Sequence, residues 1–238
     1  MVRAHQRKAA VSPTIESVLI VGAGLAGCEA ALQLADRDIP VALYEMRPDT
    51  TGPAHHTANL AELVCSNSFK SKDLNTAAGL LKSELTILGS RLLRIAAENS
   101  VPAGGALAVD REAFALQVPR TIESPPGIQL VHEEISRVPD SGRVILASGP
   151  LTSDSLANDL ALLLGENHLA FYDAAAPIVD AESLDRDIIF AASRYDKGEG
   201  ADYLNAPMDR HEYETFIAAL RSAQRVVSKE FERTDLFS

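Results

Sequence analysis

The chain has 238 residues, a formal net charge of −11 and 46% hydrophobic residues, enough to bury the core of one large α/β domain, or of one domain and part of another. The negative charge argues against a protein that coats nucleic acid, because such binding rests on neutralising phosphates. No apolar run reaches the ~18 residues that span a bilayer, so we expect no membrane contact.

The first elements predict a strand–helix–strand unit. Residues 1–16 are mixed and polar, and we expect a disordered leader there. Val18–Val21 is a short apolar run typical of a strand buried on both faces. A helix is expected over Leu25–Asp36 and a second strand over Ile39–Tyr44, which completes a βαβ unit.

The middle of the chain is predicted to be helical and then to change to short strands. One helix is expected over Ala77–Asn99, where six apolar side chains form a stripe, and another over Asp110–Val118. The stretch Val101–Val109 separates the two helices. Strands are expected over Gly127–Glu133 and Arg143–Ala147.

Four further elements are predicted toward the C-terminus: a helix over 153–164, strands over Leu169–Tyr172 and Ile188–Ala191, and a helix over 209–226. Gly165 is placed to end the first of these helices. Asp209 with Glu212 three residues later is typical of a capping box that begins the second.

These elements predict an α/β fold built on an FAD/NAD(P)-binding Rossmann-like domain, a parallel sheet with helices. We expect this domain over residues 17–180, incomplete, and the start of a smaller inserted domain over 181–238. The family resemblance given below implies in addition that the chain is C-terminally truncated.

A dinucleotide site is predicted where the first strand turns into the first helix. Gly22, Gly24 and Gly27 have the spacing that permits a tight turn, close approach of a pyrophosphate and close helix–strand packing. The N-terminus of the helix would offer free N–H groups to the phosphates. The cofactor-binding residues expected in this segment are Gly22, Ala23, Gly24, Leu25, Ala26 and Gly27. The weaker alternative is that the glycines serve turn geometry alone.

Two more segments complete the predicted cofactor site. Glu45 ends the second strand, where a carboxylate accepts hydrogen bonds from a ribose diol and disfavours a phosphate on that ribose. We also expect Arg47 to be a cofactor-binding residue. Ser148 and Gly149 follow a later strand, as a small residue and glycine do near the flavin in proteins that bind two dinucleotides. We therefore favour FAD over NAD.

The two cysteines, Cys28 and Cys65, lack metal-ligand spacing, so we expect a reducing cytoplasm and no metal. Cys28, on the inner face of the first helix, is interpreted as a small buried hydrophobe. Cys65 lies in a polar run after His55 and His56, and from the residues alone a reactive thiol and a buried one are equally favoured.

A basic stretch leaves a second question open. Six cations fall in a part of the chain that is poor in acids: Lys70, Lys72, Lys82, Arg91, Arg94 and Arg111. An ordinary solvated helix face is favoured over a local nucleic-acid surface.

Motifs in order along the chain carry a family resemblance. They are VGAGLAGCEAA (21–31), YEMRP (44–48), HHT (55–57), ELVCSNS (62–68), GGALAVDR (104–111), ASGPLTSD (147–154), FYDAAAPIV (171–179) and YLNAPM (203–208). Together they resemble TrmFO, the bacterial FAD- and folate-dependent tRNA uracil-5-methyltransferases, from about Ser17 to Phe231. The match is to the N-terminal half of such an enzyme.

The resemblance implies transfer of a one-carbon unit from 5,10-methylenetetrahydrofolate, by way of FAD, to C5 of a T-loop uridine in tRNA. NAD(P)H would supply the electrons. Cys65 matches one of two functional cysteines of the family, and the implied partners are tRNA and folate. The other cysteine belongs to an Phe-x-Gly-Cys-x-Pro segment that these residues do not contain, so we expect no turnover by residues 1–238 alone.

Two alternatives remain. One is a wobble-uridine-modifying flavoprotein of the glucose-inhibited division protein A type, in which we would not expect the segment 62–68. The other is a non-catalytic FAD-binding remnant.

Overall fold

The computed structural model describes residues 17–52, 55–64, 66–165, 179–193 and 200–224. The expected leader, the expected strand Leu169–Tyr172 and the side chain of Cys65 lie outside the described residues.

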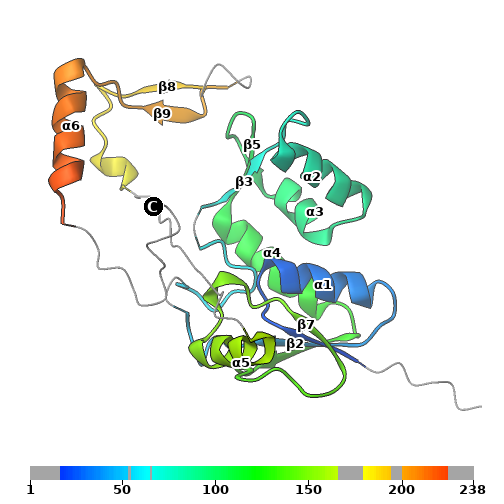
Figure 1. Cartoon of the computed structure of the whole chain (residues 1–238). Coiled ribbons are helices and arrows are strands. Elements are labelled where there is room, and N and C mark those ends of the chain that lie inside the picture. Colours follow the sequence, from blue (N-terminus) through cyan, green and yellow to red (C-terminus); the bar gives the residue numbers. More distant parts are fainter. Residues whose placement is uncertain (1–16, 53–54, 65, 166–178, 194–199, 225–238) are drawn as a thin grey trace, which may run out of the picture.

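A four-stranded parallel sheet in the order β6-β2-β1-β7 forms the centre of the fold (Figure 1). Its strands are β1 (Val18–Val21), β2 (Val41–Glu45), β6 (Ile128–His132) and β7 (Arg143–Leu146). Ile20 of β1 is fully buried, because this strand lies between two others and beneath a helix. The predicted α/β fold with a parallel sheet is confirmed.

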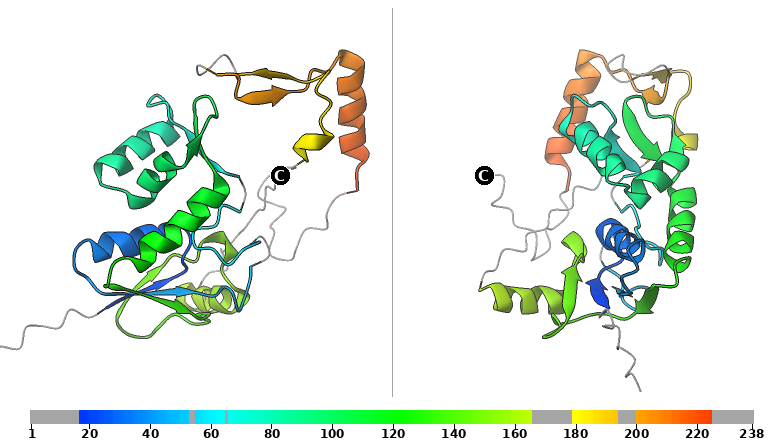
Figure 2. Two further views of the ribbon diagram at one scale, coloured as in Figure 1. Left: turned by 180° about the vertical axis from the view of Figure 1, so that it is seen from behind. Right: turned by 90° about the vertical axis from the view of Figure 1, so that its right-hand side faces the viewer.

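Helices lie on both sides of this sheet. α1 (Leu25–Ala35) and α4 (Arg111–Glu123) pack on one side, and α5 (Asp154–Leu164) lies on the other (Figures 1 and 2). Leu32 and Phe114 join the two helices to the core. Gly165, with φ of +71°, ends α5 as predicted.

A second layer packs over α1 and α4. It contains an antiparallel sheet of β3 (Ser68–Ser71), β5 (Ala106–Val109) and β4 (Ser100–Val101), in that order, with helices α2 (Ala77–Ile87) and α3 (Arg91–Glu98). The sequence had predicted strands at none of these three positions. The short strands lack the alternation that identifies longer ones, and β5 lies in the stretch interpreted as a break.

The prediction of a single helix over Ala77–Asn99 is wrong. The chain turns at Gly89, whose φ is +82°, and α3 begins anew with the Ser90 hydroxyl accepting a hydrogen bond from the Leu93 amide. The apolar stripe divides in the same way. Leu92 and Ile95 are buried, whereas four leucines are exposed: Leu80, Leu81, Leu85 and Leu88.

The last described residues form β8 (Phe190–Ala192), β9 (Tyr203–Asn205) and α6 (Arg210–Ser222), with short 3₁₀ turns η1 (Gly149–Leu151) and η2 (Ala181–Ser183) before them. The Asp209–Glu212 capping box is confirmed. The Tyr203 hydroxyl donates to the Ala103 carbonyl at 2.8 Å, which fixes the hairpin against the turn before β5. The division at residue 180 stays a prediction.

Candidate dinucleotide site

The glycine loop between β1 and α1 has the close packing that its spacing predicts. A Cβ on Gly27 would lie 1.8 Å from the Gly22 carbonyl oxygen, and a Cβ on Gly22 would lie 2.7 Å from the Ala147 oxygen. Gly22 also has φ of +98°. Both positions therefore exclude a side chain.

Gly24 differs, because a Cβ there would meet no atom within 4 Å. Gly24 is the N-cap of α1, no side chain caps this end, and the first turn carries no acidic residue. The first N–H groups of a helix have no acceptor inside it and attract anions. The loop thus leaves open space at a helix N-terminus, which fits a pyrophosphate.

A cavity of about 590 Å³, counting its open mouth, lies along this loop. It is lined by the carboxyl ends of the parallel strands and the loops after them: Val21, Gly22, Gly24, Tyr44, Glu45, Met46, Arg47, His55, Glu62, Glu133, Glu134, Ile135, Ser148, Leu151, Thr152, Ser153 and Leu156. This edge is where open α/β sheets bind ligands.

Glu45 is buried at the end of β2, with 5% of its surface exposed. Its Oε2 accepts from the Ala23 amide at 3.1 Å, and its Oε1 accepts from the Arg47 amide at 3.1 Å. Burial raises the pKa of Glu45, but these bonds and the Arg47 charge outweigh it and hold the pKa below its usual value. Glu45 is therefore an anion that is tied to the glycine loop.

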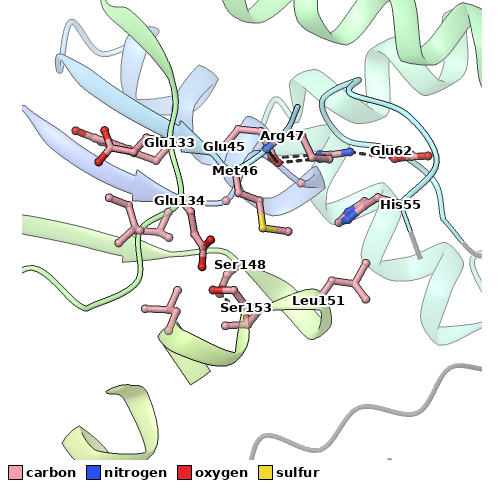
Figure 3. Close-up of a pocket in the computed structure, with 17 residues that line it drawn as sticks. Glu45, Met46, Arg47, His55, Glu62, Glu133, Glu134, Ser148, Leu151 and Ser153 are labelled. Atoms are coloured by element: carbon pink, nitrogen blue, oxygen red, sulfur yellow. Dashed lines mark hydrogen bonds and ion pairs between the residues drawn. The ribbon is translucent and has the colours of Figure 1, made fainter. Parts of the chain in front are cut away.

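Arg47 joins Glu45 to a second carboxylate (Figure 3). Its Nε donates to Glu45 Oε1 at 2.8 Å and its Nη2 to Glu45 Oε2 at 3.1 Å. Its Nη1 donates to Glu62 Oε2 at 3.0 Å and to the Thr57 carbonyl at 3.3 Å. With 1% of its surface exposed, Arg47 is a buried cation between two anions.

Glu62 holds in place the loop that joins β2 to the segment before Cys65. Its Oε1 accepts from the His56 amide at 3.0 Å and its Oε2 from the Thr57 amide at 3.4 Å. The Ala61 amide donates to the Ala23 carbonyl at 2.9 Å. The loop that precedes Cys65 is thus bound to both the glycine loop and the end of β2.

His55 also borders the cavity (Figure 3). Its Nδ1 is buried and has no hydrogen-bond partner among the described residues. Burial, followed by the positive charge of Arg47, lowers the pKa of His55. The imidazole is consequently neutral at pH 7.

The predicted cofactor residues fall in one region of the structure. Ala23 is buried under the loop, and Leu25 and Ala26 are exposed in the first turn of α1. Ser148 lines the cavity next to Gly22, and its hydroxyl accepts from the Thr152 hydroxyl at 2.7 Å. Gly149 follows with φ of +65° and begins η1.

The two cysteines remain distinct. Cys28 is fully buried, its thiol donates to the Ala23 carbonyl at 3.2 Å, and burial, with the Glu45 charge, raises its pKa to about 12. It fits the interpretation of an inert core residue. Cys65 lies outside the described residues, so its catalytic role stays a prediction.

Sequence reasoning missed the cavity residues Glu133–Ile135 and Leu151–Ser153. Glu133–Ile135 directly follow β6, and Leu151–Ser153 lie in the η1 turn and loop that follow β7, so their place at the carboxyl edge of the sheet was the signal that could have found them. Sequence reasoning also assigned no role to Glu62. Within the described ranges, no group of three or more His, Cys, Asp or Glu could hold a metal ion, and no helix is long and apolar enough to cross a membrane.

A parallel α/β sheet with a glycine-rich turn, an open helix N-terminus and a carboxylate after the second strand defines the class of dinucleotide-binding proteins. A family model described as glucose-inhibited division protein A matches residues 17–238. The chain belongs to this family.

Individual relatives show a more specific similarity than the family model does. The methylenetetrahydrofolate–tRNA-(uracil-5-)-methyltransferase TrmFO of Geotalea uraniireducens is 54% identical over 218 residues, 92% of this chain and 50% of that protein. The TrmFO proteins of Desulforamulus reducens and Bacillus subtilis are 55% and 53% identical over 92% and 93% of this chain. The resemblance to the N-terminal half of TrmFO is confirmed. The chain spans about half the length of these relatives.

Proposed function

We propose that this chain carries the FAD-binding site and one thiol of a tRNA uracil-5-methyltransferase that uses 5,10-methylenetetrahydrofolate and NAD(P)H. The observation that carries the proposal is the open space at Gly24, between the N-terminus of α1 and the buried Glu45. Identity above 50% to several TrmFO proteins supports this chemistry over wobble-uridine modification.

The residues present fit an FAD. The N–H groups at the start of α1 would hold the pyrophosphate, Glu45 would receive the ribose, and Ser148 in the cavity wall, followed by Gly149, would border the remainder. Bound FAD would supply a ring that accepts and passes on a one-carbon unit and electrons. We propose a thiolate role for Cys65 from the family resemblance of the segment 62–68 that contains it.

Catalysis is expected to need more polypeptide than the described residues. In this part of the chain β7 has no strand on its outer edge, and Ile145 and Leu146 on it are 36% and 41% exposed. Apolar edges of this kind are ordinarily covered. The same observation favours the second candidate, a non-catalytic FAD-binding remnant.

The tRNA partner is proposed from the relatives and not from a basic surface. Two of the six cations in the basic stretch are engaged by other residues of the chain: Lys82 donates to the Phe69 and Ala78 carbonyls, and Arg91 forms an exposed ion pair with Asp36 at 2.6 Å. The need for a free thiol supports a cytoplasmic location.

The test measures FAD binding and methylation separately. We expect the purified chain to retain FAD after gel filtration, seen as flavin absorbance, and to transfer no labelled carbon from methylenetetrahydrofolate to tRNA by itself. A chain extended to the length of the relatives should methylate tRNA, and Cys65→Ala should abolish that. Normal transfer by Cys65→Ala would refute the thiol role, and folded but colourless protein would refute the FAD site.

A further inference from the structure

We propose that Glu62 is the positioning residue that makes the ribose end of this site select an adenosine with a free 2′-hydroxyl over one with a 2′-phosphate. It does so by holding Arg47 neutralised against Glu45. This inference rests on the proposed dinucleotide site, and it concerns a side chain that no sequence motif had marked for cofactor binding.

The first step is the hydrogen bonding of Arg47. A guanidinium has five N–H groups, and four of those in Arg47 are used, three on the carboxylates of Glu45 and Glu62 and one on the Thr57 carbonyl. Two buried anions flank one buried cation. Arg47 therefore presents no net positive charge to a ligand in the cavity.

The second step is the hydrogen bonding of Glu45. A carboxylate offers about four acceptor positions, and Glu45 uses four, on the amides of Ala23 and Arg47 and on the Nε and Nη2 of Arg47. A ribose hydroxyl must replace one of these donors. The amides are fixed by the backbone, so the replaceable donor belongs to the Arg47 side chain. Glu62 keeps the Arg47 side chain paired when Arg47 gives up one of its hydrogen bonds to Glu45.

The third step is the charge around the cavity. Among the described residues that line it are four carboxylates, those of Glu45, Glu62, Glu133 and Glu134, together with the cation Arg47 and a neutral His55. A nearby arginine is what accommodates the 2′-phosphate in NADP sites. Arg47 is such an arginine, but its ion pair with Glu62 keeps it from binding a 2′-phosphate. Without Glu62, Arg47 would become available to a 2′-phosphate.

The test compares two probes that differ by that phosphate, ADP-ribose and 2′-phospho-ADP-ribose, by isothermal titration calorimetry. We expect the wild-type protein to bind the phosphorylated probe at least about tenfold more weakly, from like-charge repulsion at short range. Glu62→Gln should reduce the ratio of the two dissociation constants, phosphorylated over unphosphorylated probe, by about tenfold, because Arg47 becomes available to the 2′-phosphate. Arg47→Gln should widen the ratio, because it removes the cation.

Three controls separate this mechanism from a general change of charge. Glu133→Gln removes a carboxylate from the same cavity that has no side-chain bond to Arg47 among the described contacts, and should narrow the ratio less. Adding Glu62→Gln to Arg47→Gln should narrow the ratio no more than Glu133→Gln does in the wild-type background. Asp36→Asn breaks an exposed arginine–carboxylate pair and should leave the ratio unchanged.

The outcomes are distinct. An unchanged ratio in Glu62→Gln, or an equal change in Glu133→Gln, overturns the role of Glu62 while the site stands. If Glu62→Gln does not fold, Arg47→Gln decides, and a narrower ratio in it overturns the proposal. Failure of folded wild-type protein to bind ADP-ribose removes the dinucleotide site itself, and the inference with it.

Discussion

Alanine substitutions at two glycines of the same loop should have opposite consequences. At Gly27 the new Cβ would lie 1.8 Å from the Gly22 carbonyl oxygen, and backbone must move to accept it. At Gly24 the new Cβ would meet nothing within 4 Å. Gly27→Ala therefore perturbs the fold, whereas Gly24→Ala perturbs only what enters the loop.

The magnitudes follow from the packing. Overpacking against fixed backbone costs roughly 3 kcal/mol for Gly27→Ala, which lowers Tm by about 6 to 12 °C in a chain of this size. Gly24→Ala changes only an N-cap and should cost at most about 1 kcal/mol. Its Cβ takes the space that a pyrophosphate needs, so FAD affinity should fall by about tenfold or more.

Thermal melts followed by circular dichroism, together with FAD titrations, measure both effects on each variant. Equal losses of Tm in the two variants would refute the packing argument. Unchanged FAD affinity in stably folded Gly24→Ala would refute the assignment of the loop to the pyrophosphate.

Four further outcomes are expected. Cys28 should resist iodoacetamide at pH 8 in the native protein and react only after unfolding, and mass spectrometry of the Cys28 peptide checks this. The pKa of Glu45 is lower in the folded protein than its value near 4.5 in the unfolded chain, so ionised Glu45 stabilises the fold above pH 4.5, and this stability is lost as the pH falls through the folded-state pKa. Urea midpoints measured between pH 7 and 3 should therefore fall less steeply in Glu45→Gln than in the wild type. Glu29→Gln should lower stability by about 1 to 3 kcal/mol, because Glu29 accepts the Arg91 and Leu92 amides at the start of α3; an unchanged urea midpoint would contradict this. Ile87→Lys should leave Tm within about 2 °C, since that side chain is 83% exposed, and a larger fall in a thermal melt would show that it is packed.

The sequence predicted the parts of the fold whose signals are local. β1 was predicted with its observed bounds, and the Asp209–Glu212 box marked the start of α6. Each depends on neighbouring residues alone: an apolar run, or a cap with its partner three residues away.

The rest depended on contacts between distant residues. Gly89 looked like one glycine in a helical pattern, and only packing of α3 against α1, fastened by Glu29, makes it a turn. For the site, the glycines and Glu45 were identifiable because their spacing is local. Glu62 was not, because its partner Arg47 lies fifteen residues away and its role arises only in the fold.

We propose that a dinucleotide binds at the turn between β1 and α1. Backbone chemical shifts recorded while ADP is added test it most directly. We expect the largest shifts at the amides of Gly24, Leu25, Ala26, Gly27 and Ser148, and we expect Gly24→Val to abolish these shifts without unfolding the protein. Shifts confined to other parts of the chain, or unchanged binding by Gly24→Val, would contradict it.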